Sequence, residues 1–280
     1  GNTNSTGEMN ILLGAYSGRT NTSGSYNIMI GPQNYTGASN TGSDNIFIGS
    51  DAGINNTSAS GNLFIGSETG KTNSTGASNL FIGHSAGKYN STANYNTFIG
   101  VLAGGSNSTG TNNVFLGYRA GIANTIGIEN TMIGYYADVS SNNQNNSTAI
   151  GNGAVSQGSN KIRVGNSAVT EIGGEVAWST LSDKRFKSNI KDDVPGLEFI
   201  KKLKPVRYCV NTRMITENLI RNMHDSIKEI YRKTDFSESS NIKRTGFLAQ
   251  DVEVTCQEIG YDFDGVNIPK DKENLYSLSY

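Results

Sequence analysis

A five-residue unit of the form Asn-apolar-x-apolar-Gly recurs along the first half of the chain and restricts its fold more than any other feature. The units begin at Asn10, Asn27, Asn45, Asn62, Asn79, Asn96, Asn113 and Asn130, so the period is 17 residues with one step of 18. A fixed period in this range is typical of arrays in which each unit is too small to bury its own apolar face and must stack on its neighbours. The sequence therefore predicts a solenoid whose length grows with the number of units.

Each unit predicts one short strand followed by two glycine corners. The alternation Ile46-Phe47-Ile48 indicates a strand of about four residues with apolar side chains on both faces, and burial on both sides fits one coil of a solenoid. The Gly that ends each strand, and a second Gly four residues later, such as Gly53, would supply a positive φ or a close backbone approach at the corners. Stacked at about 4.8 Å per coil, nine units predict a parallel β-roll on the order of 40 Å long.

The many asparagines have two interpretations. They could contact a ligand or accept glycans, since strings such as Asn90-Ser91-Thr92 match the acceptor pattern for N-linked glycans. Asparagine is also common in turns, and an inward-facing Asn can hydrogen-bond to the backbone of a neighbouring coil. We favour turns and inward hydrogen bonds, which make the roll a scaffold.

Charged residues are concentrated towards the C-terminal end of the chain. Residues 1–175 carry 14 of the 47 charged residues and residues 176–280 carry the other 33, which indicates a domain boundary. The net charge of −1 gives no large field of one sign, and no apolar run reaches the roughly 18 residues of a membrane span. Only Cys209 and Cys256 are present, too few for a disulfide framework or a cysteine-rich zinc site. We expect no nucleic-acid partner, no membrane span, no metal and no cofactor.

The last clear unit of the array, Asn146 to Gly158, reads Asn-Ser-Thr-Ala-Ile-Gly-Asn-Gly-Ala-Val-Ser-Gln-Gly. It closely resembles the head repeat of trimeric autotransporter adhesins, which implies a left-handed parallel β-roll assembled from three chains. The earlier units depart from that repeat in their longer period and in the Phe at their middle position. An extended pattern follows the roll, carried by Ile162, Val164, Val169, Ile172 and Val176. We therefore expect a β-roll over residues 1–165 and a neck with the cleavage border over residues 166–181.

The remaining residues, 182–280, predict a small α+β domain. The expected elements are a short helix over 197–203, a strand over 206–210, a long helix over about 212–233, and a strand leading into a helix over 245–253. Phe199, Ile200 and Leu203 share one face of the first helix. The long helix carries an apolar stripe formed by Ile215, Leu219, Met223, Ile227 and Ile230.

Four segments of this domain carry a family resemblance when they are taken together. They are Ser182–Ile190, Leu203–Tyr208, Gly246–Glu253 and Tyr276–Tyr280. In order and spacing they resemble the endosialidase-type intramolecular chaperone, a self-cleaving peptidase domain at the ends of phage tailspikes, tail fibres and some surface proteins. The resemblance covers about residues 179–280, with 212–233 as an insertion. It implies a trimer that helps the upstream β-rich stalk to fold, a cut at the domain's own N-terminal border by a serine and a lysine, and C-terminal helices that this chain stops short of.

Ser182 and Lys187 are the residues that would make this cut. Ser182 Oγ would attack the carbonyl carbon of Leu181, and Lys187 would be the base that removes the hydroxyl proton. The chain must turn tightly between them, and the amine must be neutral, which burial or a nearby cation such as Arg185 would favour. We expect Asp183 to orient the turn or to pair with Arg185. In the alternative interpretation, Ser182 and Asp183 cap a helix and Lys187 is a solvated surface residue.

The sequence therefore predicts a homotrimeric surface or fibre protein, extracellular, on a cell surface or on a virion. Its C-terminal domain would assist trimerisation and folding of the roll and then act once in cis as an autoproteolytic Ser-Lys peptidase. The alternative is an adhesin or a phage tail-fibre binding module, with a host glycan or protein receptor and a catalytically inactive folding cap. No second enzymatic site is predicted in residues 1–181, because the repeats offer no convergent acid pair or triad.

Overall fold

The computed structural model describes residues 3–34, 40–173, 179–223, 225–269 and 275–279. The chain divides into two compact units. The first combines Gly1–Ser167 with Arg213–Thr234, and the second combines Ala168–Thr212 with Asp235–Tyr280. Residues 174–178 of the expected neck, which include Val176, lie outside the described residues, as does Tyr280 of the terminal segment. In the described ranges, no helix has both the length and the apolar character needed to cross a bilayer.

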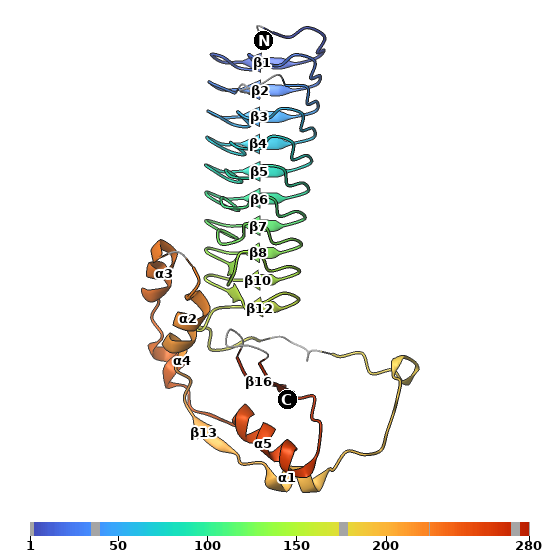
Figure 1. Ribbon diagram of the computed structural model, residues 1–280. Helices are drawn as coiled ribbons and strands as arrows, with labels where there is room; N and C mark the ends of the chain where they lie inside the picture. The colour runs from blue at the N-terminus through green and yellow to red at the C-terminus, as the bar shows by residue number, and fades with distance from the viewer. Residues whose placement is uncertain (1–2, 35–39, 174–178, 224, 270–274, 280) are drawn as a thin grey trace. The chain divides into compact units, whose positions relative to one another are not determined.

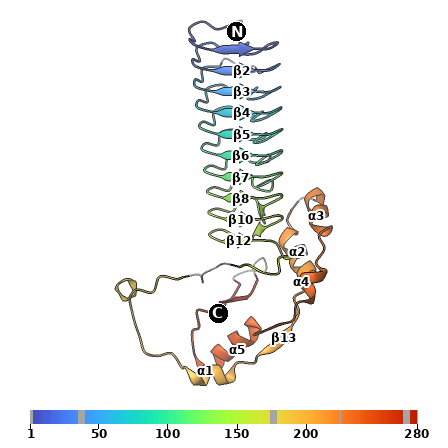
Figure 2. The same cartoon turned by 180° about the vertical axis from the view of Figure 1, so that it is seen from behind.

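The first unit contains a parallel β-solenoid in which successive strands stack in chain order (Figures 1 and 2). Each strand of its ten-stranded sheet has three residues, and equivalent residues pair from coil to coil, as Phe64 does with Phe81. The strands are β1 (Ile11–Leu13), β2 (Ile28–Ile30), β3 (Ile46–Ile48), β4 (Leu63–Ile65), β5 (Leu80–Ile82), β6 (Thr97–Ile99), β7 (Val114–Leu116), β8 (Thr131–Ile133), β10 (Thr148–Ile150) and β12 (Ile162–Val164). Two further strands, β9 (Asp138–Val139) and β11 (Val155–Ser156), pair in parallel in the last coils. The predicted parallel β-roll is confirmed.

The middle residues of β2 to β8 and of β10 form the core of the roll. Met29, Phe47, Phe64, Phe81, Phe98, Phe115, Met132 and Ala149 are all essentially inaccessible to solvent. The five phenylalanine rings stack face to face, with neighbouring centroids 4.8–5.1 Å apart. The first and third strand residues, such as Leu80 and Ile82, are only half-buried on the outer face of the sheet. The two faces of a strand are thus buried unequally, whereas the sequence indicated burial on both.

In each coil that has a phenylalanine in the middle of its strand, the second glycine lies directly against that ring. Gly87 has a φ of +57°, and a Cβ atom added there would lie 2.4 Å from Cε2 of Phe81. Side chains larger than hydrogen would therefore meet both backbone strain and a steric clash at this corner. The period of 17 residues repeats this pairing of glycine with phenylalanine along the array, as at Gly70 with Phe64 and Gly104 with Phe98.

Two ladders of buried asparagines run beside the phenylalanine stack. In one ladder, Asn79 donates through Nδ2 to the carbonyl oxygen of Ala93, and its Oδ1 accepts the backbone N–H of Asn96. In the other, Nδ2 of Asn90 donates to Oδ1 of Asn73 at 2.8 Å. Asn90 is fully buried, so in the folded chain it is not accessible as a glycan acceptor. Inward hydrogen bonding is the interpretation that the structure supports.

The last coils differ from the rest of the array. Between β10 and β12 the register step shortens to 14 residues, since Thr148 pairs with Ile162. Asp138 lies 17 residues after Gly121, at the place where the earlier coils have their second glycine. It is fully buried, and its carboxyl accepts backbone N–H groups from Ala123 and Val139, each at 2.9 Å. Burial raises the pKa of Asp138 to about 8, although these two hydrogen bonds act in the opposite direction.

This buried carboxyl predicts a pH dependence of stability. Between about pH 4 and pH 8 the folded chain keeps the Asp138 proton while the unfolded chain releases it, so the free energy of unfolding should fall as the pH rises. One pKa unit corresponds to about 1.4 kcal/mol, so the loss between pH 5 and pH 8 is on the order of 4 kcal/mol. Urea unfolding of the parent and of Asp138→Asn at both pH values isolates this residue. The variant should gain stability relative to the parent as the pH rises, and parallel curves would contradict the assignment.

The second unit has a small apolar core formed by helices and two short antiparallel sheets of two strands each. Its elements are α1 (Leu197–Lys202), β13 (Val206–Tyr208), α4 (Ser237–Asn241), β14 (Arg244–Gly246), α5 (Ala249–Ile259), β15 (Val266–Asn267) and β16 (Ser277–Leu278). β13 pairs antiparallel with β14, and β15 with β16. Phe199 of α1 packs near Val252 and Cys256 of α5. Ile200, expected on the same face as Phe199, is 60% exposed, because α1 buries only a narrow stripe.

The long helix predicted over residues 212–233 is two helices, α2 (Thr212–Ile220) and α3 (Asp225–Arg232). Both lie beside the last coils of the roll (Figures 1 and 2). Leu219 and Met223 are buried there, so the apolar stripe does mark a packing face. The break places Ile220 of α2 and Tyr231 of α3 in one apolar cluster with residues of the roll.

Candidate functional site

A single turn of 3-10 helix brings the two predicted catalytic residues together. This turn, η1 (Lys184–Phe186), begins after Asp183, whose side chain accepts the backbone N–H of Arg185. The backbone N–H of Lys187 closes the turn by donating to the carbonyl oxygen of Lys184. A 3-10 turn advances only about 2 Å per residue, so residues on either side of it stay close.

Ser182 and Lys187 are in direct contact across this turn. Nζ of Lys187 donates a hydrogen bond to Oγ of Ser182 over 2.7 Å. A nucleophile and its base must be within about 2.6–3.2 Å of each other for the proton to move between them. The geometry of this pair therefore meets that requirement in the isolated chain.

Asp183 is occupied by a different cation. Its carboxylate forms an ion pair with Arg185, with 2.6 Å between Oδ2 and Nη2, and it also accepts the Nε proton. The Arg185 side chain, followed by its backbone N–H, lowers the pKa of Asp183, while Asp183 raises the pKa of Arg185. Asp183, and not Ser182, caps the turn. The Ser182 hydroxyl is therefore not used for capping and accepts its hydrogen bond from Lys187.

The segment around the pair is exposed to solvent and rich in apolar side chains. Leu181, Phe186 and Ile190 are 80%, 72% and 62% exposed. Ser182 and Lys187 are exposed as well. Large apolar side chains gathered in a short exposed segment often mark a surface that another chain covers.

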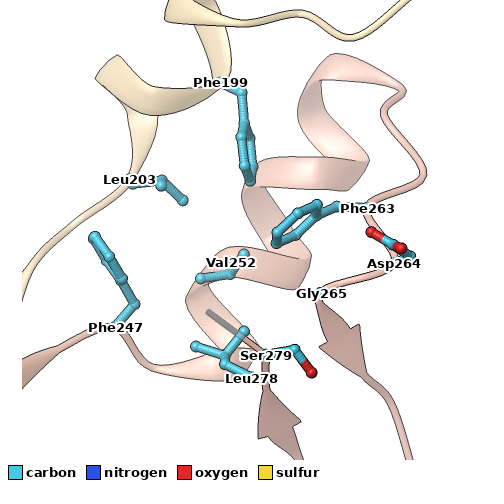
Figure 3. A pocket seen from close by; sticks show the side chains of 9 residues that line it. All are labelled: Phe199, Leu203, Phe247, Val252, Phe263, Asp264, Gly265, Leu278 and Ser279. Carbon is cyan, nitrogen blue, oxygen red and sulfur yellow. The ribbon is translucent and has the colours of Figure 1, made fainter. Parts of the chain in front are cut away.

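The second unit also contains an apolar pocket of about 450 Å³ (Figure 3). Phe199 and Phe263 line it next to each other, with ring centroids 5.1 Å apart and an angle of 56° between the rings, and Asp264 is the one charged side chain among the described residues that line it. Neither Ser182 nor Lys187 lines this pocket. Within the described ranges, no group of three or more His, Cys, Asp or Glu side chains is placed to hold a metal ion.

Sequence reasoning identified the two polar residues of the site but gave no role to Phe186. The available signal was the residue type, a large aromatic placed between the cations Arg185 and Lys187 in a short segment. In the structure the Arg185 guanidinium lies 5.7 Å from the centroid of the Phe186 ring, and Phe186 is still 72% exposed.

A protein-family model matches part of the C-terminal region of the chain. Residues 182–261 match the model of a peptidase family described as the chaperone of endosialidase. The match begins at Ser182, the residue after the expected cut, and it ends before the Tyr276–Tyr280 segment. It includes both α2 and α3. No curated protein matches the chain, and no solved structure does. The chain thus combines an N-terminal parallel β-solenoid with a C-terminal segment that matches the chaperone-of-endosialidase family, an organisation that fits a fibre-like protein.

Proposed function

We propose that this chain forms a trimeric fibre whose C-terminal domain assists its assembly and then cuts the bond between Leu181 and Ser182. The observation that carries the proposal is the hydrogen bond of 2.7 Å between Lys187 Nζ and Ser182 Oγ. The matched family is a peptidase family, and the match begins at Ser182, which supports a cut of the peptide bond between Leu181 and Ser182.

The reaction requires no group beyond this chain and one water molecule. Lys187, as the neutral amine, takes the proton of Ser182 Oγ while the oxygen forms a bond to the carbonyl carbon of Leu181. When the tetrahedral intermediate collapses, the C–N bond breaks and the proton passes to the nitrogen of Ser182. The resulting ester is opened by water, which yields a Leu181 carboxylate and restores the hydroxyl. Direct attack by water activated at the same amine would give the same products.

Assembly would switch this reaction on. The base must be the neutral amine, and burial of a lysine favours that form over the ammonium. The exposed Leu181, Phe186 and Ile190 flank the pair and would be covered where copies meet. Contact between copies would therefore remove water from the amine and delay the cut until the fibre has assembled.

The outer face of the β-roll supports assembly from several copies. The first and third residues of the ten strands form two ladders along this face, and no position in either ladder carries a charge. Several of these side chains are at least 39% exposed, including Val114, Leu116 and Ile150. We propose that three copies meet along these ladders, because in a parallel trimer equivalent residues face one another and charges there would repel. An extracellular or virion location is part of the proposal, since fibres of this type act outside the cell.

Replacing the nucleophile tests the proposed cut. The parent should yield pieces of 181 and 99 residues, whereas a Ser182→Ala chain should stay full length under the same conditions, because it has no oxygen to attack Leu181. Mass spectrometry under denaturing conditions separates the outcomes. A parent and a variant with the same masses would remove the proteolytic part of the proposal.

A receptor-binding role with an inactive C-terminal cap is the second candidate. It is favoured by exposed tyrosines on the roll, including Tyr118 and Tyr135, whose rings stack with centroids 5.4 Å apart, with Arg119 next to Tyr118. Tyrosine and arginine are enriched at binding surfaces. Selective binding on a glycan and matrix-protein array that is lost in Tyr118→Ala, by a chain that is never cut, would favour this candidate.

A further inference from the structure

The helix pair α2 and α3, which separates the two segments of the second unit in the chain, packs on the β-roll. We call residues 213–234 the insert. The insert and residues 1–167 form one compact unit, whereas the other parts of the matched domain form a second unit. The insert follows Ser182 in the chain, so it belongs to the C-terminal piece after the proposed cut. Its contacts are nevertheless made with the N-terminal piece.

An apolar cluster joins the insert to the last coils. Ile220 and Tyr231 of the insert are 1% and 5% exposed, and they pack with Tyr136 and Val155 of the roll, each 2% exposed. The Tyr136 and Tyr231 rings meet edge to face with centroids 6.3 Å apart. Apolar side chains buried this completely hold two surfaces together without any covalent link.

Specific polar contacts fix the position of the insert. The Tyr231 hydroxyl donates a buried hydrogen bond of 2.6 Å to the carbonyl oxygen of Tyr136. Burial, with a smaller contribution from Asp138, raises the pKa of Tyr231 well above its ordinary value, so the phenol keeps the proton that it donates. A second hydrogen bond joins the hydroxyls of Thr216 and Ser167.

The roll has a matching recess at this place. Gly153 has a φ of +59°, and a Cβ atom added to it would lie 3.0 Å from Cε1 of Tyr231. The glycine thus leaves the space that the tyrosine ring fills. The shapes of the coil at Gly153 and of the insert at Tyr231 are therefore complementary. The proposed cut lies between these two residues in the chain.

We propose that the insert is a clamp by which the chaperone domain grips the last coils of the roll, so that the two pieces stay associated after the bond between Leu181 and Ser182 is broken. The cut would then release the covalent link without releasing the domain, and departure of the domain would require the clamp to open. The partner of this surface is the roll itself. The inference rests on the proposed role of the domain as a folding aid, but not on the cut being made by Ser182.

The test uses an added protease to cut the chain, so it does not depend on self-cleavage at Ser182. A Ser182→Ala chain receives an N-terminal affinity tag and, in the neck between Ala168 and Leu181, the recognition sequence of a site-specific protease. After digestion, the tagged roll is captured at micromolar concentration and washed. We expect the C-terminal piece to remain bound and to elute with the roll in size-exclusion chromatography. If the C-terminal piece of this tagged chain, with no further substitution, were released in the first wash, the clamp would be wrong.

Variants separate the clamp from other contacts. Leu219→Glu with Ile220→Glu places charges in the apolar cluster and should weaken retention at least tenfold. Met214 lies in the same helix and is 70% exposed. The C-terminal piece of a Met214→Glu chain should therefore be retained like that of the parent. Tyr231→Phe removes only a hydroxyl and should weaken retention several-fold with the insert still folded. If the double variant were retained as strongly as the parent, the clamp would be wrong, whatever the outcome for Ser182.

Discussion

A Lys187→Met chain should remain intact while the parent is cut. Methionine keeps the length and apolar stem of the side chain but has no nitrogen to take the Ser182 proton. General-base catalysis contributes about 10²–10⁴-fold to a rate, so a cut completed in hours would take weeks or longer. Intact mass measured over time after purification gives the rate directly.

Lys184→Met is the matched control for this prediction. Lys184 starts the same turn and carries the same charge, but it forms no hydrogen bond with Ser182 in the structure, where the bond comes from Lys187. We expect it to be cut within a few-fold of the parent rate. Loss of cutting in both variants would point to the positive charge of the segment, and undiminished cutting in Lys187→Met would exclude this lysine as the base.

A Phe81→Ala chain should lose about 3–5 kcal/mol of stability, because it removes one ring from the centre of the phenylalanine stack. Phe81 is fully buried, and its ring lies 4.8 Å from the Phe64 and Phe98 rings on either side. Parallel coils offer no side chain that could move in from the same level, so the cavity should persist. Urea unfolding followed by circular dichroism measures the loss.

Leu80→Thr provides the control for the roll. Leu80 is the first residue of the same strand, and threonine already occupies the equivalent outer position at Thr97 and Thr131. In a single, unassembled chain, this substitution should lower the free energy of unfolding by less than about 1 kcal/mol. Similar losses from Phe81→Ala and Leu80→Thr would mean that the core is not where the structure places it.

The repeat period made the roll predictable from sequence. A strand every 17 residues, each closed by glycine, permits few folds other than stacked coils, and the same repeat accounts for the buried Asn ladders. The side on which each strand is buried was less predictable, because Leu80, Phe81 and Ile82 are all apolar. In the structure, the close approach of Gly87 to the Phe81 ring marks Phe81 as the inner residue.

The insert shows where sequence reasoning stops. An apolar stripe predicts that a helix packs on another surface, but it identifies neither the roll as that surface nor the break between α2 and α3. A pattern for the site was available, since Ser182 and Lys187 flank a segment short enough to form one turn. The exclusive pairing of Asp183 with Arg185 could not be chosen over other partners without coordinates.

The central claim is that the Ser182 hydroxyl cuts its own upstream bond once copies of the chain have assembled. The most direct measurement is molar mass in solution combined with denaturing mass spectrometry of the same chromatographic fraction. The account predicts an assembled fraction, with three copies of each piece, in which the C-terminal piece begins at Ser182. A fraction with the mass of three chains, in which every chain is still 280 residues long, would contradict it.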